Sequence, residues 1–313
     1  LIVEFTELKG KLAYFTLFFL ALAILNFVKG AITRDVMIGK DQFFSAIMLL
    51  GMTLVILPSV SILFTVFERG RKGIHAGLFT NDMSMATPSD PITSGGLLHA
   101  IVGTILLVSV ALVLSLPIGI LTALYLTEIK GRFTRPIRFL VQAMSGVPSI
   151  VAGLFILSSI VYTVTKSYSG IMGSLALTIL MIPTIARTAE EVLNLIPNDL
   201  REAGVALGGT QWRTVAMVVV PAAKSGLITA IILGVARIVG ETAPILLLTG
   251  GGDAVNLNPA SGAMGSLPFY IWKSFLLGTE ESITRGWAGL LVLLVLVLSL
   301  FTVARILGSR RSK

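Results

Sequence analysis

The chain contains no cysteine and only two histidines, His75 and His99, among its 313 residues. Without cysteine it cannot form a disulfide, supply a thiolate nucleophile or hold a metal through sulfur, and two histidines are too few for a histidine cluster. Charged residues are also scarce, at 13% of the composition. These absences exclude thiol chemistry and most zinc chemistry, and we expect no metal site in this chain.

The sequence also lacks the G-x-x-x-x-G-K-[ST] pattern with which P-loop proteins hold nucleotide phosphates. It contains no nucleophile and base in a pattern that would indicate an intramembrane enzyme. We therefore expect that the chain is not an enzyme, that it has no catalytic residues and binds no cofactor, and that it does not itself hydrolyse ATP.

What the chain has in abundance is apolar sequence. Hydrophobic residues make up 55% of it and the mean hydropathy is +0.92, outside the usual balance of soluble domains. The net charge of +8 is compatible with nucleic-acid binding, with an anionic membrane surface, or with the loop bias of an integral membrane protein. The hydropathy favours the third reading, so we expect contact with the lipid bilayer and none with nucleic acid.

Seven apolar stretches approach the roughly 20 residues that a helix needs to cross a bilayer. In one of them the sequence GVPS intervenes, and Pro148 should bend the helix because it removes a backbone donor. The sequence therefore predicts an all-α polytopic membrane protein with about six to seven transmembrane helices. The stretches are 12–28, 44–67, 97–126, 138–164, 170–186, 226–248 and 287–307.

The charges of the loops predict the orientation. With the N-terminus outside, the inner segments carry most of the Lys and Arg residues, as the positive-inside rule requires. The polar segment 187–224 and the basic residues Arg310, Arg311 and Lys313 then lie inside, and the loops 68–96 and 249–286 lie outside. A basic cluster in 68–96 opposes this orientation, so the alternative that 12–28 does not cross the membrane stays open.

The inner segment 187–224 predicts a helix–turn–helix protrusion. Asp199 followed by Glu202 fits a capping box at a helix start, and Gly208 permits the positive φ that ends a helix. A second helix should run from about Gln211 to Pro221. On this pattern alone, an amphipathic linker that rests on the membrane surface is an equally good interpretation.

The order of residues in this protrusion resembles the E-A-A…G…L-P signature of ABC importer permeases. Gly204 stands where the signature has its second alanine, and Val220 stands for the leucine. In that family the segment forms coupling helices that dock into a cytoplasmic ATPase, which binds ATP and Mg²⁺. The resemblance implies that this chain couples to such an ATPase through Glu202, Ala203, Gly204, Gly208 and Pro221.

Three more stretches narrow the resemblance to the PstA-type permease subunits of phosphate importers. They are GVPSIVAGLF at 146–155, IPTIARTAEEVLNLIPNDLREA at 182–203 and ARIVGETAPILL at 236–247. The sister PstC-type subunits usually have Met-Ala after GET, so the GETAP sequence favours the PstA type.

This resemblance implies a type I ABC importer permease fold of the MetI-like kind in the cytoplasmic, or inner, membrane of the cell. Residues 1–96 would form N-terminal transmembrane helices and an external loop, and 97–313 would form the permease core with its coupling helices at 187–224. The implied partners are a PstC-type second permease, a dimer of PstB-type ATPase subunits and an external PstS-type phosphate-binding protein.

Arg237 lies within the apolar stretch 226–248, where a charge is costly unless it faces protein or water. Glu241 follows at i+4, the spacing at which two helical side chains can pair. One interpretation is that the pair only locks helices together. The other is that Arg237 lines an anion path and Glu241 restrains it, which the resemblance favours.

Arg187 is a second candidate for the anion path, at the inner end of 170–186. An arginine at this depth usually extends to lipid headgroups or sets the topology, and this alternative stays open. The resemblance implies a role in the path, because the family has an arginine at the matching position.

Three other functions stay open on the residues alone. The chain could be the sister PstC-type subunit, a permease for another oxyanion, or a transporter or channel that works without ATP. Secondary transporters often contain inverted repeats, and this sequence shows none, which favours the ABC permease.

Overall fold

The computed structural model describes residues 11–33 and 35–309. Residue contacts divide the chain into two compact units, Leu1–Phe67 and Glu68–Lys313. By contacts, the segment 68–96 thus belongs with the helices that follow it, and the division into 1–96 and 97–313 stays a prediction. The basic residues expected at the inner face, Arg310, Arg311 and Lys313, lie outside the described residues.

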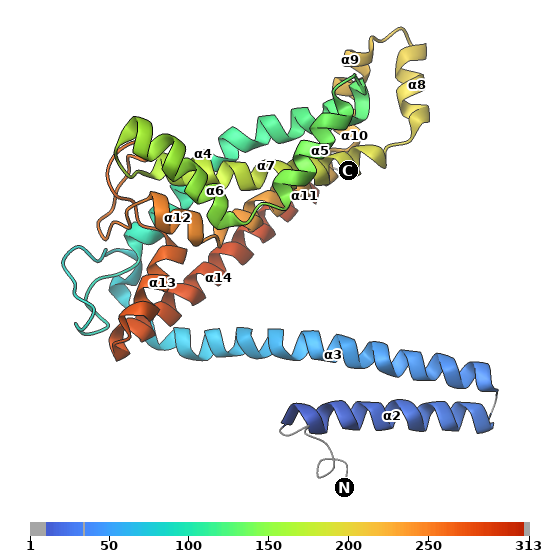
Figure 1. Ribbon diagram of the computed structural model, residues 1–313, viewed down its shortest axis with the longest axis horizontal. Coiled ribbons are helices and arrows are strands. Elements are labelled where there is room, and N and C mark those ends of the chain that lie inside the picture. The colour runs from blue at the N-terminus through green and yellow to red at the C-terminus, as the bar shows by residue number, and fades with distance from the viewer. Residues whose placement is uncertain (1–10, 34, 310–313) are drawn as a thin grey trace. The chain divides into compact units, whose positions relative to one another are not determined.

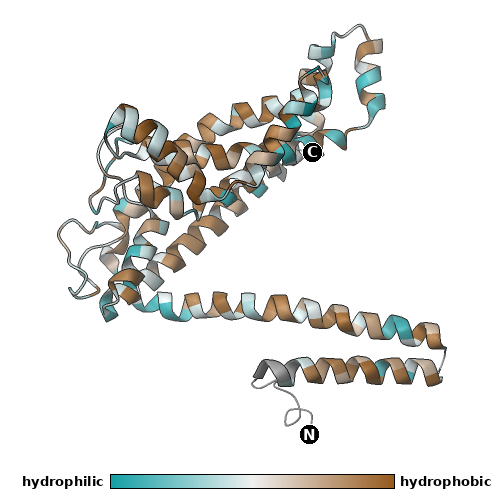
Figure 2. Ribbon diagram, in the orientation of Figure 1, coloured by the Kyte–Doolittle hydropathy of each residue, from teal (hydrophilic) through white to brown (hydrophobic). Residues whose placement is uncertain are grey.

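The first unit is a pair of mostly apolar helices (Figure 2). They are α2 (Lys11–Thr33) and α3 (Val36–Gly70), whose last turn belongs to the second unit. A Cβ on Gly30 of α2 would lie 2.9 Å from the Cα of Gly39 of α3. The absence of both side chains therefore lets the two helices turn as a tight hairpin.

The second unit is built from helices with loops at its ends (Figure 1). Three π-helical turns continue α-helices: η3 (Tyr125–Ile129) continues α4, η4 (Leu157–Thr165) continues α6, and η5 (Val215–Val219) continues α9. Two 3₁₀ turns, η1 (Arg71–Gly73) and η2 (Ala76–Phe79), precede α4. The α-helices are α4 (Leu98–Leu124), α5 (Thr134–Ser145), α6 (Ser149–Ile156), α7 (Gly170–Asn194), α8 (Asn198–Ala206), α9 (Gln211–Thr214), α10 (Val220–Ala222), α11 (Lys224–Val239), α12 (Ala243–Leu248), α13 (Leu267–Leu277) and α14 (Glu280–Ser309).

These helices confirm the predicted class of protein. Within the described residues, β structure is limited to one isolated bridge between Gly250 and Met264. In the part of the chain that the structure describes, five helices are long and apolar enough to cross a membrane, and up to seven spans result if each of two bent helix pairs counts as one. The chain is therefore an all-α, multi-pass membrane protein.

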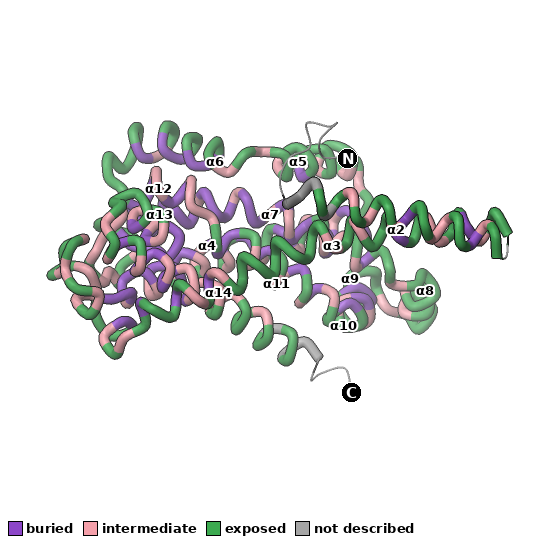
Figure 3. Tube along the Cα trace, turned by 90° about the horizontal axis from the view of Figure 1, so that it is seen from below, coloured by how far each residue is buried: buried purple, intermediate pink, exposed green. Residues whose placement is uncertain are grey.

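Helix α7 forms the centre of the second unit (Figure 3). It packs against α4, α5, α6, α11 and α12. Ile185 of α7 is fully buried, and a Cβ on Gly119 of α4 or Gly234 of α11 would lie 2.8 or 2.7 Å from its side chain. Glycine at both positions therefore lets α4 and α11 approach α7 closely from two sides.

Two of the predicted spans are broken. The expected interruption at Pro148 is confirmed, since α5 ends at Ser145, Pro148 is the N-cap of α6, and the two helices meet at an angle of 103°. The apolar stretch 226–248 is also broken, because α11 ends at Val239 and α12 begins at Ala243. Pro244 lies in the first turn of α12, where proline needs no hydrogen-bond acceptor, and so it starts a helix and does not distort one.

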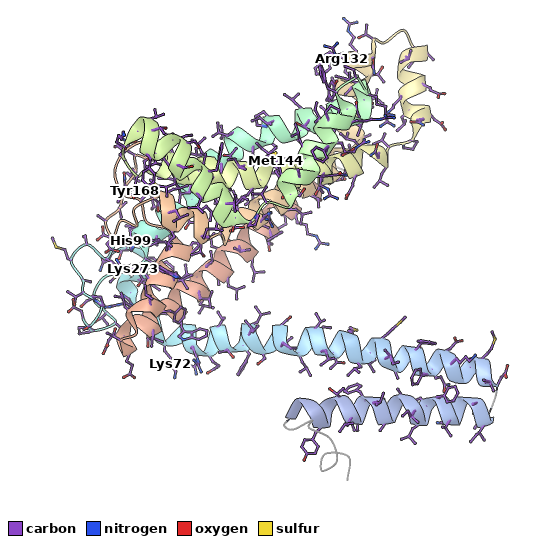
Figure 4. The ribbon with its side chains drawn as sticks, in the orientation of Figure 1. Lys72, His99, Arg132, Met144, Tyr168 and Lys273 are labelled. Atoms are coloured by element: carbon purple, nitrogen blue, oxygen red, sulfur yellow. The ribbon has the colours of Figure 1, made fainter. Side chains whose placement is uncertain are left out.

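The loops 76–96 and 249–266 meet at one end of the second unit, where Figure 4 labels His99 and Lys273. The Asp253 carboxylate pairs with the Lys273 ammonium at 2.6 Å, and the backbone N–H of Val255 donates to the Asp82 carboxylate at 3.1 Å. This confirms the prediction that 68–96 and 249–286 share a side. The reading of 249–286 as a loop is wrong in part, since α13 and the start of α14 lie within it.

A buried arginine fastens this end. Arg285 of α14 is 3% exposed, and its guanidinium donates to five backbone carbonyls of the loop 76–96. The carbonyls of Thr87, Pro88 and Pro91 also accept from other groups of the chain, so this one cation adds a second donor to them and gathers the loop around itself. The acceptors are Thr87, Pro88, Asp90, Pro91 and Ser94, at 2.8 to 3.3 Å.

At the opposite end, α8 to α10 form the predicted helix–turn–helix protrusion (Figure 1). Gly208 has φ +81°, which confirms the predicted turn, and the second helical segment runs from Gln211 to Ala222. The predicted capping box is wrong: the N-cap of α8 is Pro197, without a side-chain hydrogen bond. Asp199 lies inside the first turn, where its charge favours the helix dipole.

Gly204 sits where the two helices of the protrusion touch. A Cβ at this position would lie 2.5 Å from the Cγ2 of Thr214, and Thr214 is buried. The glycine that replaces alanine in the signature therefore has a structural reason, since Thr214 fills the space of the missing methyl group.

The substitution Gly204→Val should loosen the protrusion, because overpacking of this kind costs about 1–3 kcal/mol. We expect amide hydrogen exchange over Asn198–Ala206 to become about tenfold faster in the purified variant, by mass spectrometry. Gly208→Asn is the control, because asparagine tolerates a positive φ and a Cβ at Gly208 meets no atom within 4 Å. Unchanged exchange in Gly204→Val would contradict this account of the packing.

Candidate functional site: an arginine-lined cavity and a helical protrusion

Arg187 and Arg237, the two arginines predicted for an anion path, line one cavity of about 340 Å³. Arg187 comes from α7 and Arg237 from α11, and α5 closes the cavity with Met144, which Figure 4 labels. The structure thus brings together two cations that lie 50 positions apart in the sequence. The remaining lining residues are Ser145, Leu180, Pro183, Thr184, Thr188 and Glu191.

The fold of α7 and α11 determines where the two arginines point. Arg187 follows the fully buried Ile185 and Ala186, so the buried face of α7 fixes its position. Arg237 lies in the last turn of α11, where the partial negative charge of the helix end stabilises a cation. Both side chains are exposed on the surface of the chain.

The two guanidinium groups are the donors that this cavity offers an oxyanion. The hydroxyls of Ser145 and Thr184 already donate to the carbonyls of Val141 and Leu180, so their protons are not available to an anion. Among the described residues, neither Arg187 nor Arg237 takes part in an ion pair. Their planar guanidinium groups can therefore direct donors at an anion that enters the cavity.

Glu241 is not part of this cavity. Because α11 ends at Val239, Glu241 lies in the linker to α12, and the i+4 geometry of a continuous helix does not apply to it. The structure shows no ion pair between Arg237 and Glu241 in the part of the chain that it describes. The predicted pair is therefore not formed here.

An ion pair between α5 and α7 supports the wall of the cavity. Arg138 of α5 donates from Nε and Nη2 to one carboxylate oxygen of Glu190 at 3.0 and 2.6 Å. Glu190 is adjacent in sequence to Glu191, which lines the cavity. The ion pair with Arg138 therefore holds α5 next to the cavity. Sequence reasoning missed Glu191, although its spacing from Arg187, four residues on the same helix, was a usable signal.

The protrusion carries the residues predicted for coupling. Glu202 and Ala203 of α8 are exposed, Gly208 forms the turn, and Pro221 lies in α10. Leu207 is 90% exposed at the tip of the protrusion. An exposed carboxylate beside exposed apolar side chains is suited to contact another protein.

The inner side of the protrusion is fastened to the core by a residue that sequence reasoning missed. Arg201 of α8 forms an ion pair with Glu128 of η3 at 2.8 Å. The hydrogen bond to this carboxylate raises the pKa of the Arg201 guanidinium above its ordinary value. No sequence pattern predicts this ion pair, because the two residues lie 73 positions apart.

No metal centre is apparent in the described ranges: no three or more His, Asp and Glu side chains there are placed to hold a metal ion. The chemistry that this arrangement offers is thus anion binding by guanidinium groups, together with a protein-binding protrusion at one end of the core.

Comparison with known proteins agrees with this arrangement. Residues 115–313 match the family described as binding-protein-dependent transport system inner membrane component. The solved structure of the MetNI methionine ABC transporter, in an inward-facing conformation, is similar with a TM-score of 0.55 at 23% identity, over 67% of this chain and 92% of that chain. This likeness shows the fold, a type I ABC importer permease of the MetI-like kind.

Relatives with higher identity cover most of the chain. The phosphate transport system permease protein PstA 1 of Mycobacterium tuberculosis is 36% identical over 279 residues, which is 88% of this chain and 90% of the relative. The PstA protein of Pasteurella multocida is 40% identical over 257 residues, 80% of this chain and 88% of the relative. The chain therefore belongs to the PstA family of phosphate transport system permease proteins.

Proposed function

We propose that this chain is the membrane-spanning permease subunit of an ATP-driven importer of inorganic phosphate. In this function it forms half of the translocation pathway and couples to a cytoplasmic ATPase. The single observation that carries the proposal is the cavity that Arg187 and Arg237 line together. The names of the relatives, phosphate transport permeases, support phosphate as the anion.

The cavity suits transient binding of phosphate. Two guanidinium groups donate several hydrogen bonds to phosphate oxygens, often two in parallel from one arginine. Glu191 lines the same cavity, and its negative charge lowers the affinity, which a pathway needs so that the anion can leave. Glu241 stays a predicted pathway residue because it follows Arg237 closely in the sequence, although it does not line the cavity.

The protrusion suits docking to an ATPase. Glu202 and Ala203 lie on the exposed face of α8, and Gly204 permits the contact with Thr214. Gly208 makes the turn, and Pro221 lies in α10, the last part of the second segment. The ATPase, a PstB-type dimer, would bind ATP and Mg²⁺, so this chain needs no catalytic residue. Its closure would displace the coupling helices as nearly rigid bodies.

The remaining parts of the proposal concern partners and location. The chain works with other components of an ABC transporter, and we assign these as a PstC-type permease and a PstS-type phosphate-binding protein. The protrusion faces the cytoplasm, and the end with Asp253 and Lys273 faces outward, where the binding protein would arrive. The membrane is then the cytoplasmic, or inner, membrane of the cell.

The experiment that tests this function is uptake of labelled phosphate into vesicles that contain this chain, its partner permease and the ATPase. We expect accumulation that requires ATP, the binding protein and the ATPase. Sulfate serves as the control anion. Accumulation by vesicles that lack the ATPase would overturn the proposal, because it would show an ATP-independent transporter.

Arg187→Gln and Arg237→Gln should each lower the rate of phosphate uptake about tenfold or more, because each removes charge-assisted hydrogen bonds to the anion. The initial rate in the same vesicles is the measurement. Arg305→Gln, an exposed arginine of α14 outside the cavity, is the matched control and should transport normally. Normal uptake by Arg187→Gln and Arg237→Gln would remove the cavity from the path.

A further inference from the structure

Arg201 lies directly before Glu202 in α8, yet its side chain turns away from the exposed face of the protrusion and toward the core. Its Nε donates to Oε2 of Glu128 at 3.0 Å, and its Nη2 donates to Oε1 at 2.8 Å. The Glu128 side chain is 5% exposed and that of Arg201 is 22% exposed. This two-point contact is the geometry in which arginine holds a carboxylate most specifically.

The same guanidinium also closes the end of α7. Nη2 donates to the carbonyl of Leu193 at 2.9 Å, and Nη1 donates to the carbonyl of Ile196 at 2.6 Å. Leu193 lies in the last turn of α7 and Ile196 in the linker that follows it, so Arg201 holds both the helix end and the linker beside α8. One side chain of α8 therefore contacts the ends of both α4 and α7.

The second helix of the protrusion is tied to the same place. The side-chain amide of Gln211 donates to the backbone carbonyl of Glu128 at 2.6 Å. Both helices of the protrusion thus meet at one residue, at the end of the π-helical turn η3 that continues α4.

We propose that Arg201 and Glu128 form a clamp that makes the protrusion move as one body with the inner ends of α4 and α7. The inference rests on the proposed function. The exposed residues of α8 receive the push of the ATPase, and the clamp passes it to α7, which carries Arg187 at the cavity. Arg201 and Glu128 are positioning residues, since neither lines the cavity.

The connection between α7 and α8 shows why a clamp is needed. Only the residues 195–197 separate the two helices, and Leu195 is 80% exposed, so its side chain adds almost no packing. On the other side of α8, Gly208 and Gly209 form the turn to α9. Without the Arg201 contacts α8 could pivot about both connections, and a push on it would be lost as local motion.

A clamp and a merely stabilising contact predict different measurements. If Arg201 only stabilised the chain, its loss would lower the amount of assembled transporter, and phosphate transport and ATP hydrolysis would fall in proportion. If Arg201 transmits motion, assembled transporters continue to hydrolyse ATP while transport fails. The ratio of phosphate molecules transported to ATP molecules hydrolysed separates the two.

The experiment measures this ratio in vesicles that contain the complete transporter, with wild-type chain or Arg201→Met. We expect Arg201→Met to assemble with the ATPase and to lower the ratio about tenfold, within the range of coupling between distant sites. Arg201→Lys should give an intermediate ratio, because lysine keeps the charge but cannot reach the carboxylate and both carbonyls at once.

Two further variants complete the design. Arg71→Met removes another arginine paired with a glutamate, Glu68, within one exposed segment, and should leave the ratio unchanged. Glu128→Gln keeps the shape of the side chain and removes its charge, so it reports on the clamp even if Arg201→Met does not assemble. We expect it to lower the ratio about threefold, as the loss of one charged partner would.

A wild-type ratio in Glu128→Gln and in whichever Arg201 variants assemble would overturn the clamp and leave the proposed function intact. A wild-type transporter that takes up no phosphate with ATP would overturn the proposed function, and the clamp with it. The two failures are therefore distinguished by the wild-type vesicles in the same experiment.

Discussion

The close packing around Ile185 is the constraint on which the rest of the structure depends. This side chain fits between Gly119 of α4 and Gly234 of α11, and a methyl group on either glycine would overlap with it. Interiors packed at this density transmit displacement because they cannot absorb it. Since α7 is held here, Arg187, two residues further along, has a fixed place beside Arg237.

The same helix connects the two functional parts of the chain. Its second half lines the arginine cavity, and its C-terminal end is bonded to the protrusion through Arg201. Polar side chains buried within the core, such as Thr104, Ser174 and Thr178, donate to backbone carbonyls, because an unpaired polar group in hydrocarbon is costly. The end opposite the protrusion is fastened separately by Arg285, which donates to five carbonyls.

Hydropathy alone was enough to predict the class of protein, the approximate spans and the polar protrusion, because each of these is a local property of the sequence. Gly208 was predictable for the same reason. The helix end at Val239 was not predicted, although Gly240 and Pro244 are residue types that commonly follow one helix and begin the next. Nor were the cavity and the contact of Arg201 with Glu128 predictable, because both join residues from helices far apart in the sequence. The apparent Arg237–Glu241 pair shows how spacing misleads when a helix is assumed to continue.

The central claim is that the protrusion lies in the cytoplasm, where a separate ATPase holds it, and that the loop end lies outside. The absence of cysteine allows a direct test with single cysteines at two exposed positions, Met85→Cys in the outer loop and Leu207→Cys at the tip of the protrusion. The measurement is labelling by a membrane-impermeant maleimide in intact spheroplasts. The account predicts labelling of Met85→Cys, and labelling of Leu207→Cys only after permeabilisation and less when the ATPase is present. Labelling of Leu207→Cys in intact spheroplasts would contradict it.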